Sequence, residues 1–223
     1  MKYRAAVLVL VLAAACSPEP IGPGDDAAGF SVVNGAGGAG AVKVYMDGVF
    51  AADVAAGEQG RVAADPGTHQ VELRRADGSG AVARPVTLAA GVPLTIVAWD
   101  SLGILRPAVL EDSNSVVAPG KSKMRVAHYA GSAGSIDIWR TQPDYGTPVR
   151  IMFPFRYGEV SPFLESTPGA WRVLVSTAIA APNGPMPDTL AMTGGIMAGD
   201  GEARTVVVVD RAGGGVNIIS VEP

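Results

Sequence analysis

The chain has 223 residues, of which 48% are hydrophobic and 17% are charged, with 17 basic and 21 acidic side chains. This length fits one large domain or two small ones, and the mild acidic excess has the wrong sign for a nucleic-acid-binding surface. A single cysteine excludes an intrachain disulfide. One cysteine and two histidines are also too few ligands for a zinc site of the usual Cys/His kind. We therefore expect no nucleic-acid partner, no cofactor and no metal.

Residues 1–15 have the features of a secretory signal peptide. Lys2 and Arg4 precede an uninterrupted apolar stretch from Ala5 to Ala15 that ends in small residues. The stretch of 11 residues is too short for a membrane-spanning helix, which needs roughly 20. The segment predicts an exported protein.

The cysteine lies directly after this apolar stretch. Leu12-Ala13-Ala14-Ala15-Cys16 resembles the bacterial lipobox, in which the cysteine is acylated and becomes the first residue of the mature protein. The resemblance implies a lipid anchor at Cys16 that holds the protein on a membrane surface. Ser17 resembles the residue found there in lipoproteins sent to the outer membrane. Two alternatives remain open, since Cys16 could also be a chance residue of an ordinary signal peptide or a free thiol.

Residues 16–27 are predicted to form a disordered tether that carries the lipid. After Cys16, the sequence SPEPIGPGDDAA contains three prolines, two glycines and three acids, and Ile21 is its single large apolar residue. Such a segment cannot bury a core. We expect it to connect the anchor to a folded part that begins near residue 28.

The folded part contains the same pattern twice. The stretch from Val32 aligns with that from Val126 at an offset of 94, DPGTHQVEL aligns with TPGAWRVLV at 102, and TIVAWD aligns with TVVVVD at 110. The second copy thus has two extra segments of eight residues, near 141–148 and 181–188, and both are rich in turn-forming residues. The sequence predicts domain one over residues 28–112, a linker over 113–121 and domain two over 122–223.

Within each copy the apolar residues alternate with polar ones. Val42 and Val44 alternate in copy one as Ile136 and Ile138 do in copy two, which is typical of half-buried strands. Continuous apolar runs such as residues 205–209 suit central strands. Turn signals recur between the strands. The predicted fold class is all-β, with two tandem immunoglobulin-like antiparallel β-sandwich domains.

These residues support a family resemblance. A small-residue loop followed by alternating V-x-V-Y-x-D-G and then P-G-T-x-x-V-x-L occurs over Val32–Gly48 and Pro66–Leu73, and recurs in part over Val126–Arg140 and Pro168–Val175. The pattern resembles the bacterial domain-of-unknown-function family four-three-nine-seven, whose members often occur in tandem and are often secreted or lipidated. The resemblance implies an envelope or extracellular β-sandwich and supplies no catalytic residues.

Motifs with catalytic potential have simpler structural explanations. Gly35 to Gly40 contains G-x-G-x-x-G, but a strand pattern follows where a nucleotide-binding loop needs a helix, so we predict a tight loop between strands. His128 precedes Ser132 and Ser135, yet no G-x-S-x-G occurs, and a strand-end or surface histidine is the simpler interpretation. Asp100 and Asp210 recur at matched strand ends and are expected to cap turns.

A calcium site made from loop carboxylates stays open as an alternative. Asp144, Glu159 and Asp188 are its candidate ligands, although their spacing shows no EF-hand pattern.

Aromatic residues are concentrated in the second copy. Eight of the 13 lie between residues 129 and 171. Trp139 is out of phase with Ile136 and Ile138, so it could belong to an exposed face that stacks on a glycan or an envelope protein. Trp139, Tyr145 and Tyr157 are the candidate contact residues. The alternative is that these side chains cover domain two or pack against domain one.

The sequence therefore predicts a cell-envelope lipoprotein, anchored in the outer membrane if the host has one. We expect a non-enzymatic binding or structural module with no catalytic residues. An accessory subunit of an envelope assembly is one alternative, and a hydrolase with its site in the domain-two loops is another.

Overall fold

The computed structural model describes residues 28–101, 103–112, 117–141, 146–179, 184, 186–211 and 213–221. The predicted signal peptide and tether, with Cys16, lie outside the described residues, as do Tyr145 and residues 113–116 of the predicted linker. The described chain consists of β-strands, turns and two short 3-10 segments, so the all-β prediction is confirmed. No helix in this part of the chain has the length and apolar character needed to cross a membrane.

Eight strands form the first half of the folded chain, which we call sandwich one. They are β1 (Ala28–Asn34), β2 (Val42–Met46), β3 (Val49–Val54), β4 (Gln59–Ala64), β5 (Gly67–Arg75), β6 (Val82–Leu88), β7 (Leu94–Ser101) and β8 (Ile104–Glu111). One sheet has the order β4-β1-β7-β8 and the other β3-β2-β5-β6. Their facing sides enclose a core that includes Phe30, Val44, Leu73 and Ile96.

Ten strands form the second half, which we call sandwich two. They are β9 (Ser122–Tyr129), β10 (Ile136–Arg140), β11 (Val149–Phe155), β12 (Leu164–Ser166), β13 (Gly169–Trp171), β14 (Val173–Thr177), β15 (Thr189–Met192), β16 (Ile196–Ala198), β17 (Ala203–Asp210) and β18 (Val216–Val221). The sheets have the orders β12-β9-β17-β18, β11-β10-β14-β15 and β13-β16. Ile136, Ile138, Val175 and Val206 belong to its core.

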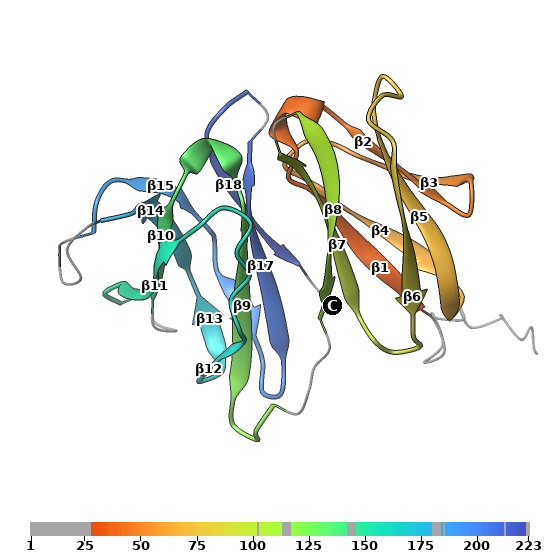
Figure 1. Ribbon diagram of the computed structural model, residues 1–223. Helices are drawn as coiled ribbons and strands as arrows, with labels where there is room; N and C mark the ends of the chain where they lie inside the picture. The colour runs from red at the N-terminus through yellow and green to blue at the C-terminus, as the bar shows by residue number, and fades with distance from the viewer. Residues whose placement is uncertain are drawn as a thin grey trace, which may run out of the picture.

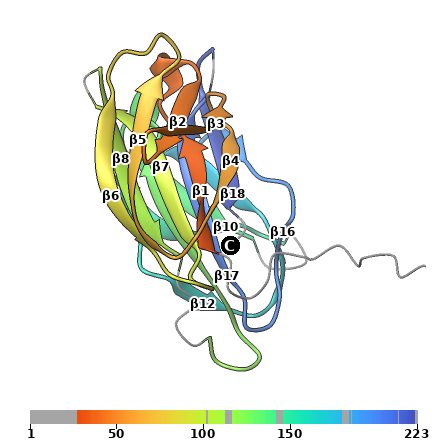
Figure 2. The same ribbon diagram turned by 90° about the vertical axis from the view of Figure 1, so that its right-hand side faces the viewer.

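The two halves share the order of their strands. The sheet β4-β1-β7-β8 corresponds to β12-β9-β17-β18, and the two lie beside each other between the remaining sheets (Figures 1 and 2). Among the described strand pairs, β1–β7 and β9–β17 are parallel and the others are antiparallel. The antiparallel prediction therefore needs correction at one pair in each half. A parallel pair requires a crossover connection, and the chain makes that crossover through the opposite sheet.

The glycine-rich loop has the same geometry in both halves. The segments η1 (Gly37–Ala39) and η2 (Gly131–Ala133) are each followed by a glycine, Gly40 or Gly134, with a φ of 65°. Only glycine adopts this left-handed conformation at little cost. Strand β2 follows η1 directly, so the prediction of a tight loop between strands is confirmed.

Asn34 and His128 stabilise this loop in the same way. The Asn34 Nδ2 atom donates to the Gly40 carbonyl at 2.8 Å, and the His128 Nε2 atom donates to the Gly134 carbonyl at the same distance. The Ala130 backbone N–H donates to His128 Nδ1 at 3.3 Å. One ring nitrogen accepts and the other donates, so the imidazole is neutral. Burial lowers the pKa of His128 and favours this neutral form.

Replacement of His128 should separate these hydrogen bonds from simple packing. We expect His128→Ala to lower the free energy of unfolding by about 1–3 kcal/mol, because buried backbone groups lose their partners. His128→Asn should cost less, since Asn34 makes the corresponding bonds in sandwich one. Urea denaturation of the three proteins measures the difference. Equal losses in both variants would contradict this role.

His69 and His128 should change the free energy of unfolding with pH in opposite directions. Because the pKa of His128 is lowered, unfolding takes up a proton between that pKa and about 6.5, so the free energy of unfolding rises with pH across this window. Hydrogen bonds to Asp47 and the Asp65 carbonyl raise the pKa of His69. The contribution of His69 is therefore complete below about 6.5 and is lost as the pH rises through its raised pKa. Urea midpoints of the wild type and His128→Asn from pH 5 to 8 should differ in slope on the acid side.

Candidate functional site: the junction between the two sandwiches

The two central sheets pack face to face across an apolar junction. In β17, Val206 and Val208 point into the core of sandwich two, whereas Val207 and Val209 point toward sandwich one. Strands β1, β7 and β9 divide their side chains in the same way. The buried cluster consists of Val33, Val97, Leu110, Ala127, Tyr129, Val207, Val209, Ile219 and Val221. The central strands are therefore buried on both faces, and apolar burial joins the halves into one body.

A buried ion pair closes one end of the junction. The Arg125 Nη2 atom lies 2.6 Å from Asp112 Oδ1, and the two side chains are 11% and 7% exposed. Thr205 and Thr95 donate their hydroxyl groups to the Asp112 carboxylate at 2.6 and 2.5 Å. Arg125 also donates to the Thr205 hydroxyl at 3.0 Å. Because these groups come from β7, β9, β17 and the end of β8, the network bridges both sandwiches.

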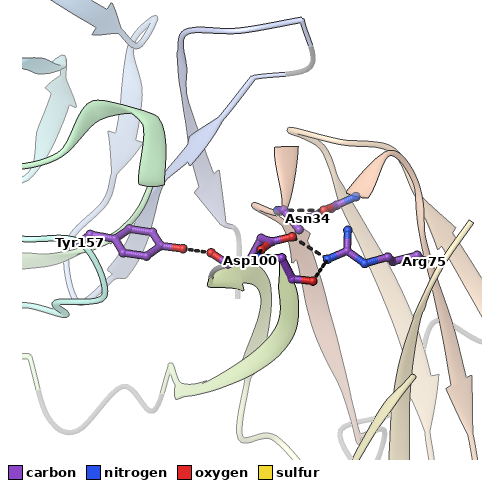
Figure 3. Close-up of polar contacts among 6 residues, drawn as sticks. Asn34, Arg75, Asp100 and Tyr157 are labelled. Atoms are coloured by element: carbon purple, nitrogen blue, oxygen red, sulfur yellow. Dashed lines mark hydrogen bonds and ion pairs between the residues drawn. The ribbon is translucent and has the colours of Figure 1, made fainter. Parts of the chain in front are cut away.

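Three aromatic rings close the other end. Trp99 lies 5.5 Å from Tyr129 and 5.3 Å from Tyr157 between ring centroids. The Tyr157 hydroxyl donates to the backbone carbonyl of Asp100 in sandwich one (Figure 3). Burial, with a contribution from the Asp210 carboxylate, raises the pKa of Tyr157 to about 12. The phenol thus remains a hydrogen-bond donor at neutral pH.

Asp100 connects this contact to the far sheet of sandwich one. Arg75, at the end of β5, donates to Asp100 Oδ2 at 2.6 Å and to the Gly103 carbonyl at 2.9 Å (Figure 3). The Gly103 N–H donates to Asp100 Oδ1 at 2.7 Å. Asp100 therefore caps the β7–β8 turn as predicted, and it also orients the carbonyl that Tyr157 binds.

Asp210 binds a different turn from the one predicted. Its carboxylate accepts the N–H groups of Gly131 and Ser132 at 3.0 and 3.1 Å and the Ser132 hydroxyl at 2.5 Å. It thereby holds η2 rather than its own turn, because η2 presents free N–H groups at this strand end. Asp210 lines an open hollow of about 220 Å³ between the sandwiches, together with Gly37, Gly38, Ser132, Arg211 and residues 213–215.

His128, Ser132 and Asp210 all lie around η2, but their bonds do not match a catalytic triad. The Ser132 hydroxyl donates to Asp210, and both His128 ring nitrogens bond backbone groups. A nucleophilic serine needs its hydroxyl bonded to the base. These three side chains therefore stabilise the loop.

Trp139 is not part of an exposed aromatic face, and this prediction is wrong. Its side chain is 7% exposed, and its Nε1 atom donates to the Ser176 hydroxyl at 2.9 Å. Neighbouring groups of the same sheet face are buried too, including an ion pair between Arg150 and Asp137 at 3.3 Å. The alternation correctly places Trp139 outside the core, but that outer face is covered in sandwich two.

Tyr157 and Trp139 occupy different places. Tyr157 contacts sandwich one, as the alternative interpretation of the aromatic residues expects, whereas Trp139 lies on the outer face of β10. Tyr145 lies outside the described residues.

Sequence reasoning missed the Asp112–Arg125 network. Arg125 interrupts the apolar strand that contains Met124, Val126 and Ala127. A charged residue inside a strand buried on both faces requires a partner, so this position could have indicated a buried acid. Its pairing with Asp112 in the other half is a tertiary contact that no local pattern specifies.

Within the described ranges, no group of three or more His, Cys, Asp or Glu side chains is arranged to hold a metal ion. Of the candidate calcium ligands, Glu159 accepts the Arg156 backbone N–H at 2.7 Å. Asp144 lies outside the described residues.

The chain belongs to the family described as domain of unknown function (DUF4397), whose model matches residues 28–139. The match spans sandwich one and continues through β9 and η2 into β10, and these elements correspond to β1, η1 and β2. The predicted family is confirmed. No curated protein is significantly similar to the chain.

Several solved structures resemble the chain weakly. The Bacillus anthracis TIE protein has 8% identity and a TM-score of 0.27, over 82% of this chain and 34% of that one. A leucine-rich repeat protein from Bacteroides thetaiotaomicron has 10% identity and a TM-score of 0.23, over 81% of this chain and 26% of that one. A candidate adhesin from Bacteroides ovatus has 9% identity and a TM-score of 0.26, over 86% and 92%. The chain thus spans about a third or less of the first two proteins, and similarities of this size carry no functional argument.

Removal of the buried carboxylate should weaken the junction strongly. We expect Asp112→Ala to lower the free energy of unfolding by about 3–5 kcal/mol, because Arg125 keeps its charge in a buried site without a partner. Tyr157→Phe removes one hydrogen bond and should cost only about 0.5–1.5 kcal/mol. Thermal and urea denaturation test both values. A stability of Asp112→Ala equal to the wild type would show that the network does not hold the sandwiches together.

Proposed function

We propose that this protein is a non-catalytic, lipid-anchored module of the cell envelope that binds or supports other envelope components. In this proposal the signal peptide is removed, Cys16 is acylated, and the residues up to 27 link the lipid to β1. The apolar stretch and the position of Cys16 directly after it support the anchor.

The proposal that the protein is not a catalyst rests on one observation: the polar side chains at the junction bond one another or the backbone. Arg75, Asp100 and Tyr157 bond one another or backbone groups at one end, and Asp112 and Arg125 bond each other at the opposite end. These bonds join strands and sandwiches. They support the proposal of a rigid scaffold that binds through a surface away from the junction.

A role as an accessory subunit has support from sandwich two. Its edge strands β11 and β15 and the short strand β16 carry exposed apolar side chains: Val149, Phe153, Leu190, Met192 and Met197. Exposed apolar residues of this size at the edges of a sheet are suited to protein contacts. Pull-down from solubilised membranes would identify such an assembly.

The anchor has a direct test. We expect the protein made in its own host to start at an acylated Cys16 and to fractionate with membranes, whereas Cys16→Ser should release the protein from them. Mass spectrometry of the mature N-terminus and cell fractionation measure the two effects. An unmodified thiol at Cys16 in the mature protein would overturn this localisation.

A further inference from the structure

The sheet of sandwich one that faces away from the junction has a polar and aromatic side whose residues are half-buried or exposed. Lys43 and Tyr45 alternate with the core residues of β2, and Glu72 and Arg74 alternate with those of β5. The cross-strand partners of Lys43 and Tyr45 are Asp53 and Phe50 in β3. We call this surface the open face and define it by Lys43, Tyr45, Phe50, Asp53, Glu72 and Arg74. It lies on the side of sandwich one opposite sandwich two (Figures 1 and 2).

A β-bulge places Phe50 on this face. The pairing of β2 with β3 runs from Val44 opposite Ala52 to Tyr45 opposite Phe50, which leaves Ala51 as an extra residue. In a regular ladder, Ala51 would lie opposite Tyr45 and Phe50 opposite Met46, whose side chain packs against the core. The bulge therefore turns Phe50 outward, where it is 54% exposed. Bulges often serve to redirect a side chain at a functional surface.

The open face combines aromatic rings with hydrogen-bonding groups. The Tyr45 and Phe50 rings lie 5.7 Å apart between centroids, and the Arg74 guanidinium lies 4.2 Å from the Tyr45 centroid. Glu72 accepts two hydrogen bonds of 2.8 Å from Arg74. The ion pair fixes Arg74 over one ring, so Phe50 is the ring left most accessible for stacking.

The corresponding surface of sandwich two is closed. Trp139 is the counterpart of Tyr45 at the offset of 94, and it is buried. Leu174 and Ser176 replace Glu72 and Arg74 at the offset of 102, and both are buried. The same sheet is thus covered in one half and exposed in the other.

We propose that the open face binds a neutral glycan, with Phe50 stacking on a sugar ring and Lys43, Asp53 and Glu72 bonding its hydroxyl groups. This inference rests on the proposed binding role in the envelope and names the ligand class. Aromatic rings stack on the apolar side of sugar rings, and charged side chains form strong hydrogen bonds with hydroxyl groups.

The balance of charges on the open face favours an uncharged ligand over an anionic one. It carries two basic and two acidic side chains, namely Lys43, Arg74, Asp53 and Glu72. A balanced set gives no net attraction for an anionic polymer, which requires a basic surface. An uncharged polyhydroxylated ligand complements it best.

The test is calorimetric titration of the full chain, purified in detergent, with maltohexaose, cellohexaose and chitohexaose as neutral probes and alginate as the anionic probe. We expect at least one neutral oligosaccharide to bind and alginate to bind no better. Phe50→Ala should weaken binding about tenfold, which corresponds to the loss of one aromatic contact. Phe50→Tyr should retain it. Phe153→Ala is the matched control, because Phe153 is 50% exposed on β11, the counterpart of β3.

Far-UV circular dichroism and urea midpoints verify that each variant is folded. The proposal is overturned if no neutral probe binds, if alginate binds best, or if Phe50→Ala binds as the wild type does. An equal loss of affinity in Phe153→Ala would also overturn it. So would a Phe50→Ala variant that no longer self-associates through β3 but keeps the wild-type affinity for the oligosaccharide. The titration does not depend on Cys16, so its failure is distinguishable from failure of the lipid anchor.

Discussion

The architecture depends on the packing of sheet β4-β1-β7-β8 against sheet β12-β9-β17-β18. Strands buried on both faces need apolar side chains at successive positions, and β17 meets this requirement from Val206 to Val209. Apolar contact alone would allow the sheets to slide. The pair Asp112–Arg125 fixes their alignment, because a displaced register would bury each charge without its partner. Tyr157 fixes the opposite end through the β7–β8 turn.

The two sandwiches use one backbone plan for different surfaces. Asn34 and His128 differ chemically, yet each donates to the carbonyl of the loop glycine and accepts the backbone N–H two residues further on, so the loop has the same form in both halves. The outer sheets differ much more. Sandwich one has the ion pair of Glu72 and Arg74 where sandwich two has Leu174 and Ser176. The two less polar residues of sandwich two are buried. The inner sheets thus hold the two sandwiches together, and the outer sheets carry the difference between them.

Local patterns predicted the parts of this structure that depend on local physics. Alternation located strands such as Val42–Met46 and Ile136–Arg140, and glycine content located the loop that holds η1. Long-range packing escaped the same reasoning. Trp139 was correctly placed off the core, but alternation cannot say whether an outer face is covered. Phe50 was missed because a bulge shifts the period by one residue. Arg125 and Tyr157 act across the junction, where no spacing in the sequence indicates the partner.

The fold also determines where a tether from a membrane anchor would join the folded part of the chain. Strand β1 belongs to the inner sheet, and Ala28 lies at the same end of that sheet as Leu94 and Glu111, next to the Asp112 network. A tether from Cys16 would therefore attach at the junction rather than at the outer sheet β3-β2-β5-β6. The 11 residues between Cys16 and Ala28 span at most about 40 Å, which would limit the distance between the proposed anchor and this end of the junction. The open face, on the opposite sheet, lies away from this point of attachment (Figure 1).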